Sequence, residues 1–368
     1  MRKALVLVLC QQLLCGGEVG QLVFNGNEVM QGDYPFVGRI DCKQQLNRTH
    51  GTCGATLISR RVMLSGHLCL HKCSEDLLPS AYKPVYIGYS IVGGTENSRE
   101  RDAEEKAGAR TVAIRAIHKL EDAKPYVDMV VVELEWDATL LDGCRQYGTP
   151  IDLALLPFAD PVQACSASAD GWSVDSGLAF DFEKDEDKGP QNSRPTDCRA
   201  LGWGADTSNK DITKPERSDS PIGFCSVIAG QSIQFAQALS EKLGYKMGSK
   251  DILNLYCYNN SVITGPCPGD EGGPIICSHP DVSGRPILFA VASFFDHIFV
   301  KNDNRETGCN DQDAQFIITD LRRNMPHIRA TLVKHDLLDD LCDTYTACQL
   351  PKEIPLPDPD PKSIKRCA

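Results

Sequence analysis

Three side chains of this 368-residue chain stand in local settings that could support chemistry: His67, Asp128 and Glu271. His67 follows two short apolar stretches, and Asp128 precedes the apolar run 129–132. Glu271 follows Asp270 and precedes two glycines and a proline. A histidine and two carboxylates could move a proton or bind a metal ion. The metal interpretation is weak because the set offers no second histidine.

The stretch around Glu271 is the most specific of the three. Residues 267–274 read Cys-Pro-Gly-Asp-Glu-Gly-Gly-Pro, and Cys277 follows. They resemble the nucleophile loop of the chymotrypsin/trypsin-like serine proteases, Cys-x-Gly-Asp-Ser-Gly-Gly-Pro. In that family the serine attacks the substrate and backbone N–H groups form an oxyanion hole. The resemblance places Glu271 at the serine position, and Gly269 and Glu271 at the oxyanion hole.

A glutamate cannot perform the serine's task at this position. Its carboxylate would have to form a mixed anhydride, which lies well above an amide in free energy. It would also place negative charge where the oxyanion must develop. We therefore expect a catalytically inactive homologue, or pseudoprotease. The alternative is an active trypsin-like endopeptidase, if Glu271 is an error in the sequence or another group supplies the nucleophile.

A second motif carries the histidine. Residues 53–58 and 62–69 resemble the family's Cys-Gly-Gly-Ser-Leu-Ile and Val-Leu-Thr-Ala-Ala-His-Cys. The resemblance makes His67 the histidine of the catalytic triad. The match departs from the motif at one point, because Leu68 separates His67 from Cys69.

A third motif carries the aspartate. Residues 128–134 resemble Asp-Ile-Ala-Leu-Leu-Lys-Leu, the buried strand whose first residue orients the histidine. Asp128 is therefore expected at the third triad position. We expect His67 to lie between Asp128 and Glu271, and two neighbouring negative charges should raise its pKa.

Substrate pocket and activation residues also follow from the resemblance. Gly265, six residues before Glu271, leaves the base of the specificity pocket without a carboxylate. Ser293 lies on the strand along the substrate channel, and Phe295 replaces the glycine at the pocket mouth. Val23 matches the N-terminus that cleavage frees to pair with Asp270, but a leucine precedes it where trypsin-type activation needs Arg or Lys.

The resemblance covers about residues 23–334 and implies an all-β fold. It consists of two antiparallel six-stranded β-barrels, about residues 23–150 and 198–320, with the site in the cleft between them. Pro326 is expected to open a short C-terminal helix in which Ile328 and Leu332 share a face. Residues 335–368 form a tail rich in cysteine and proline, and the prolines favour extended polyproline II.

Several signals indicate a secreted, extracellular protein. Residues 1–17 combine a charged start, an apolar run and small residues, as in a signal peptide. Elsewhere no apolar run is long enough to span a bilayer. The 17 cysteines fit an oxidising compartment, and the sequons at Asn47 and Asn259 predict glycosylation.

The disulfide pattern is taken partly from the resemblance, which implies the pairs Cys53–Cys69, Cys198–Cys277, Cys225–Cys257 and Cys267–Cys309. Outside the signal peptide, these cysteines are left without an assignment: Cys42, Cys73, Cys144, Cys165, Cys342, Cys348 and Cys367. An odd number cannot pair completely within one chain. Cys367, near the end of the tail, is the best candidate for a free thiol or an interchain disulfide.

The charge composition of the chain indicates which classes of partner to expect. The net charge of −12 and the lack of basic patches argue against nucleic acids and anionic membranes. We expect no cofactor and no metal, since the polar segment 95–110 lacks clean calcium-ligand spacing. The expected partners are extracellular proteins, including proteases or their substrates, for which the chain serves as a decoy, cofactor or inhibitor.

Overall fold

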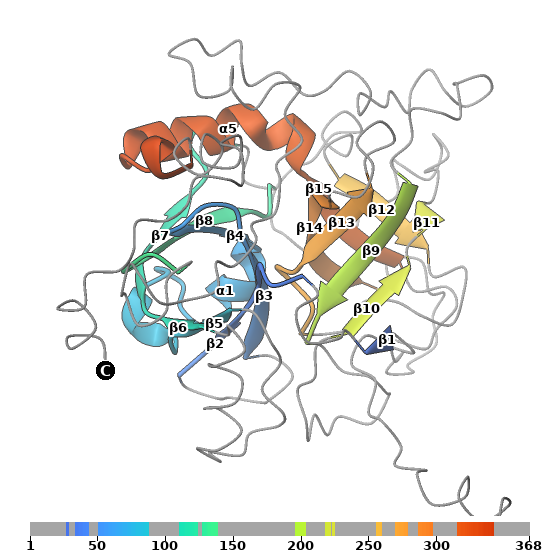
Figure 1. The fold of residues 1–368 in the computed structure, drawn as a ribbon, viewed down its shortest axis with the longest axis horizontal. Helices are drawn as coiled ribbons and strands as arrows, with labels where there is room; N and C mark the ends of the chain where they lie inside the picture. The colour runs from blue at the N-terminus through green and yellow to red at the C-terminus, as the bar shows by residue number, and fades with distance from the viewer. Residues whose placement is uncertain are drawn as a thin grey trace, which may run out of the picture.

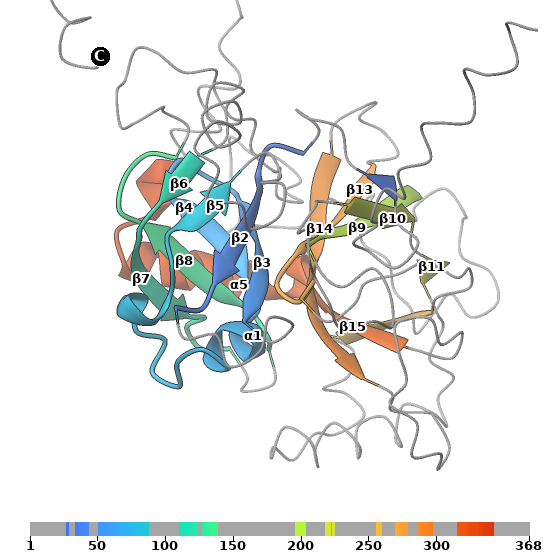
Figure 2. The ribbon, with the colours of Figure 1, turned by 90° about the horizontal axis from the view of Figure 1, so that it is seen from below.

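The computed structural model describes residues 27–28, 34–43, 51–87, 110–123, 127–138, 196–203, 218–221, 223–224, 255–259, 269–278, 286–296 and 315–341. In this part of the chain two antiparallel sheets lie next to each other, and a C-terminal helix packs on the first (Figure 1). A view from below shows the same two bodies with the strands of each wrapped around its own interior (Figure 2).

The N-terminal sheet closes on itself through one kinked strand. Its order is β6-β5-β2-β3-β4-β8-β7. The edge strands β6 and β7 are separated in the chain only by Ala113, so one stretch of chain pairs at both edges. Counted in this way the barrel has six strands, as predicted. The bounds are β2 (Val37–Asp41), β3 (Thr52–Leu57), β4 (Val62–Ser65), β5 (Val85–Ile87), β6 (Arg110–Val112), β7 (Ile114–Lys119) and β8 (Val130–Leu134).

The C-terminal sheet is built in the same way. Its order is β1-β10-β9-β13-β14-β15-β12-β11, and β10 and β11 are one residue apart in the chain. Strand β1 comes from the N-terminal segment and adds to β10. The all-β, trypsin-like fold class is therefore confirmed. The bounds are β1 (Asn27–Glu28), β9 (Thr196–Gly202), β10 (Ser218–Pro221), β11 (Gly223–Phe224), β12 (Leu255–Asn259), β13 (Pro274–Ser278), β14 (Pro286–Asp296) and β15 (Gln315–Asp320).

Strands β4 and β8 explain why two apolar stretches of sequence flank the candidate site. Both read as nearly continuous apolar runs, and all their residues are buried. Such runs form strands that are covered on both faces. The one charged residue in β8, Glu133, contacts His118 Nε2 at 3.1 Å and Arg115 at 3.2 Å. These partners offset the cost of burying its carboxylate.

The C-terminal helix α5 (Leu321–Lys334) begins directly after β15. The prediction that Pro326 opens this helix is wrong, because Pro326 lies inside it. A proline in a helix lacks one backbone hydrogen bond. Burial of Leu321 and Met325 in the core, both 0% exposed, keeps the preceding turn helical. The predicted buried face containing Ile328 and Leu332 is confirmed.

Two further short helical segments are α1 (His67–His71) and the 3₁₀ helix η1 (Pro79–Ala81). Among the described residues, no helix has both the length and the apolar character that crossing a bilayer requires.

Three disulfides lie within the described residues. Cys53–Cys69 and Cys198–Cys277 are present as predicted. Cys42 and Cys73, which the sequence left unassigned, form the third. The predicted pairs Cys225–Cys257 and Cys267–Cys309 lie outside the side chains that the structure describes, as do the sequons at Asn47 and Asn259 and the cysteines Cys144, Cys165, Cys342, Cys348 and Cys367.

Candidate functional site

The loop 269–273 joins the two barrels where the sequence places the site. Gly54 in β3 donates its N–H to the carbonyl oxygen of Glu271 at 2.7 Å. On the other side, Gly272 donates to the carbonyl oxygen of Ala292 in β14 at 2.7 Å. Gly272 has a φ of 83°, and a Cβ there would clash with the Gly54 carbonyl and the Ser65 hydroxyl. The loop thus needs glycine at this position to pack against both barrels.

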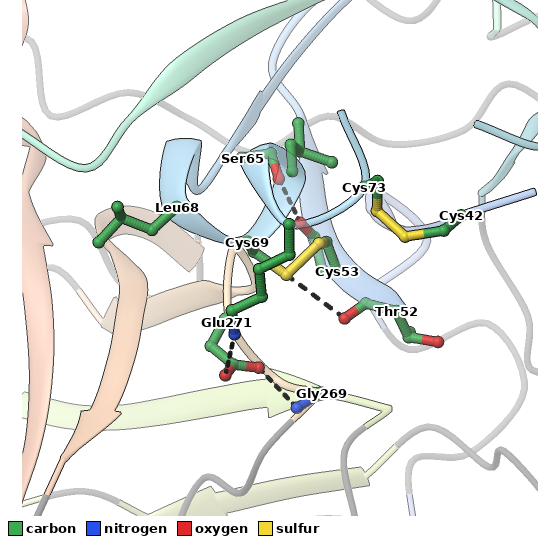
Figure 3. Close-up of a disulfide and its surroundings, with 12 residues drawn as sticks. Cys42, Thr52, Cys53, Ser65, Leu68, Cys69, Cys73, Gly269 and Glu271 are labelled. Carbon is green, nitrogen blue, oxygen red and sulfur yellow. Dashed lines mark hydrogen bonds and ion pairs between the residues drawn. A yellow bond between two sulfur atoms is a disulfide. The ribbon is translucent and has the colours of Figure 1, made fainter. Parts of the chain in front are cut away.

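The side chain of Glu271 turns back onto its own loop. Gly269 donates its backbone N–H to Oε2 of Glu271 at 2.6 Å, and Nζ of Lys72 lies 3.4 Å from Oε1 (Figure 3). Glu271 is only 6% exposed. The carboxylate therefore occupies one of the donors that the resemblance assigns to the oxyanion hole.

Lys72 is a site residue that the sequence analysis missed. It caps the C-terminus of α1, between two half-cystines, Cys69 and Cys73. Cys69 is bonded to Cys53 and Cys73 to Cys42, and the Cys53–Cys69 disulfide is drawn beside Glu271 (Figure 3). Since the Lys72 side chain is 43% exposed, solvent screens its ion pair with Glu271.

Asp128 lies buried behind this loop, 2% exposed. Its Oδ1 accepts the backbone N–H of Leu68 at 2.6 Å, and its Oδ2 accepts the hydroxyl of Ser293 at 2.5 Å. Burial raises the pKa of Asp128 to about 6, against the two hydrogen bonds, which lower it. Of the more distant charges, that of Lys72 lowers this pKa and that of Glu271 raises it.

His67 does not join the other two residues. Within the described part of the chain, no hydrogen bond or ion pair links its ring to Asp128 or Glu271, and its buried Nε2 has no hydrogen-bond partner. Burial lowers the pKa of His67 to about 4, and the charges of Lys119 and His71 act in the same direction. The expectation of a raised pKa between two carboxylates is therefore wrong.

The Cys53–Cys69 disulfide shows where the sequence departs from the motif. In the motif that this stretch resembles, the histidine directly precedes the cysteine. Here Leu68 directly precedes Cys69, and Leu68 is the residue whose backbone reaches Asp128. Counting back from Cys69, rather than matching to the nearest histidine, is the sequence signal that would have found this arrangement.

The remaining predicted residues are placed as follows. Asp270 is 2% exposed, and its carboxylate packs so closely on Gly202 that this glycine has no room for a Cβ. Val23 and Gly265 lie outside the described residues, as does the side chain of Phe295.

The metal alternative is not supported by the geometry. Among the described residues, no group of three or more histidine, cysteine, aspartate or glutamate side chains could hold a metal ion, and this includes the set of His67, Asp128 and Glu271.

Comparison with known proteins finds a distant relative. The chain is 23% identical over 173 residues to the protein named serine protease grass of Drosophila melanogaster. The match covers 45% of this chain and 44% of that protein, so the chain spans less than half the length of the relative. No family model matches the chain. Together with the two barrels and the disulfides, this similarity makes the chain a distant homologue of a serine protease.

Proposed function

We propose that this chain is a secreted, catalytically inactive homologue of the trypsin-like serine proteases that acts by binding other extracellular proteins. The observation that carries the proposal is the set of contacts around Asp128. Both carboxylate oxygens accept hydrogen bonds, from the Leu68 N–H and the Ser293 hydroxyl, and among the described residues neither accepts a hydrogen bond from a histidine ring.

In this proposal, two of the three triad positions carry side chains that cannot perform the catalytic step. In a working triad the aspartate orients a histidine, and the histidine takes the proton of the serine. Leu68 occupies the histidine position, and its side chain has no group that can accept a proton. Glu271 occupies the serine position and has no hydroxyl. Loss of any triad member leaves only about 10³–10⁴-fold catalysis over water, which is negligible for a peptide bond.

Secretion is supported by the covalent chemistry of the described residues. They contain three disulfides, and disulfides persist mainly in oxidising compartments. The signal-like residues 1–17 point to the same compartment.

The proposed class of partner rests on the similarity of this chain to a serine protease and on its two barrels. The relative is named as a serine protease, and the fold of this chain retains the two barrels that frame a protease cleft. We propose proteases or their protein substrates as partners, with the chain serving as a decoy, cofactor or inhibitor in a proteolytic pathway.

Covalent labelling tests the lack of activity. Purified protein is incubated with a fluorophosphonate probe, which reacts with an activated serine, beside trypsin as positive control. We expect no label on the chain. A label on any of its serines, with peptide hydrolysis at an enzymatic rate, would establish the alternative, an active endopeptidase.

Capture from the secreted fluid tests the binding role. The folded chain is immobilised, and a reduced and alkylated sample serves as the control, because reduction destroys the disulfide-bonded surface. We expect a protease or a protease substrate to be retained by the folded chain alone. Equal recovery on both samples would contradict a specific binding role.

A further inference from the structure

We propose that the oxyanion-hole donors of this chain are kept as a carboxylate-binding site, and that the side chain of Glu271 is its resident ligand. Gly269 and Lys72 hold the carboxylate, one oxygen each. The proposal rests on this geometry and not on the identity of any partner protein. It assigns the loop a structural task in a chain that does not use it for catalysis.

The contact with Gly269 has the features of a specific anion site. The bond from N to Oε2 is 2.6 Å long and buried. A hydrogen bond to an ionised acceptor is short and about twice as strong as one between neutral groups. A carboxylate as buried as that of Glu271 needs such donors, because an unpaired buried charge is very costly.

The donors are held by a scaffold that does not depend on the Glu271 side chain. Gly269 has a φ of 104°, which glycine tolerates, and this conformation aims its N–H at the site. Backbone bonds fix the rest of the loop: Gly54 to the Glu271 carbonyl at 2.7 Å, Gly272 to Ala292 at 2.7 Å, and Gly273 to the Asp270 carbonyl at 3.0 Å. If the carboxylate were removed, the donors would remain in place.

Lys72 gives the site its preference for an anion. Its backbone lies between Cys69 and Cys73, which are both bonded to other segments, so the base of the side chain is fixed beside the loop. A cation at this point favours a carboxylate over a neutral carbonyl oxygen. Lys72 lies 199 residues from Glu271 in the sequence, so the pairing is a product of the fold.

The proposal has a consequence for partners. While the Glu271 carboxylate is bound, a carbonyl oxygen of a substrate or a substrate-like inhibitor loop cannot accept the Gly269 N–H. A partner that contacts this loop must therefore bind without the oxyanion-hole hydrogen bond.

Chemical rescue tests the site. In E271A the carboxylate is deleted and a space is left beside the same donors. We expect the melting temperature of E271A to fall below that of the native chain. Sodium acetate should raise it in a saturable manner, because a ligand that binds only the folded state stabilises it by mass action. Sodium chloride at equal ionic strength and uncharged acetamide are the matched controls.

The variants separate the site from a general salt effect. Acetate should leave the melting temperature of the native chain unchanged, since the resident carboxylate already fills the site. K72M/E271A should need higher acetate concentrations for the same rise. Equal rises for the native chain and E271A, or none for either, would overturn the proposal.

A second measurement applies if E271A does not fold. E271Q keeps the size of the side chain but removes the charge. We expect the Gly269 amide proton, followed by NMR, to resonate at lower field in the native chain than in E271Q, because the charge-assisted bond is stronger. Identical resonances would overturn the proposal. Fluorophosphonate labelling, by contrast, bears only on the proposed function, so the two can fail separately.

Discussion

The backbone N–H of Leu68 donates a 2.6 Å hydrogen bond to Oδ1 of Asp128, and the ring of His67, one residue earlier, makes no bond to that carboxylate. A single residue thus separates the histidine of this chain from the place where it would serve as a base. We infer that a histidine at position 68, and not at 67, would meet both the aspartate and the loop at Glu271.

Restoring the chemistry should therefore require two substitutions. L68H supplies an imidazole next to Asp128, and E271S supplies the hydroxyl and frees the Gly269 donor. We expect E271S alone to stay unlabelled by a fluorophosphonate probe and L68H/E271S to be labelled on the introduced serine. L68H/E271A is the matched control. Labelling of E271S alone at the rate of the double variant would mean that His67 acts as the base after all.

The fold was predictable because disulfide and glycine motifs mark the ends of its strands. The stretch 53–69 contains both cysteines of the Cys53–Cys69 disulfide. The stretch 267–277 contains Cys277, which is bonded to Cys198. The position of His67 was not predictable by motif matching. Helix α1 begins at His67, where one added residue rotates a side chain by about 100° about the helix axis.

The contacts of Glu271 could not be predicted from the sequence for a different reason. The partners of Glu271 include its own loop and Lys72, which is remote in sequence, and no local pattern reports such a pairing. The same holds for Cys42 and Cys73, since spacing alone does not fix which cysteines pair.

The pH dependence of stability should show two opposing contributions. The pKa of His67 is lowered from 6.5 to about 4, so its neutral form stabilises the fold above pH 6.5 and this stability is lost as the pH falls towards 4. The pKa of Asp128 is raised from 3.8 to about 6, so the folded state gains stability as the pH falls from 6 towards 3.8. Between pH 4 and 6 the two contributions cancel.

H67Q should isolate the contribution of His67 to the pH dependence of stability. The free energy of unfolding, measured with urea at pH 4, 5, 6 and 7, should rise from pH 6 to pH 4 relative to that of the native chain. The difference between the two proteins has a slope of at most about 1.4 kcal/mol per pH unit. Other titrating groups are common to both proteins and drop out of the difference. A flat difference between pH 4 and 6 would contradict the lowered pKa of His67.

The disulfide that the sequence did not assign should be a major source of stability. Cys42 and Cys73 are 31 residues apart, and closing a loop of this length stabilises a fold by about 3–4 kcal/mol in the chain-entropy model. We expect C42S/C73S to lower the free energy of unfolding by about that amount. The single variants C42S and C73S are the controls, and each should lose at least as much as the double variant. A double variant as stable as the native chain would mean that the two thiols are not bonded.

The last prediction concerns the electrostatic coupling of the two carboxylates. The negative charge of Glu271 raises the pKa of Asp128, and the positive charge of Lys72 lowers it, while burial is the largest cause of its value of about 6. E271Q should therefore lower the pKa of Asp128, but not to the ordinary 3.8, since the burial remains. K72M is the matched variant of opposite sign, and it should raise the same pKa. Carbon-13 NMR of the Asp128 carboxyl measures both shifts. A shift in the same direction for the two variants would mean that the loop rearranges, because a fixed geometry requires the two charges to act oppositely.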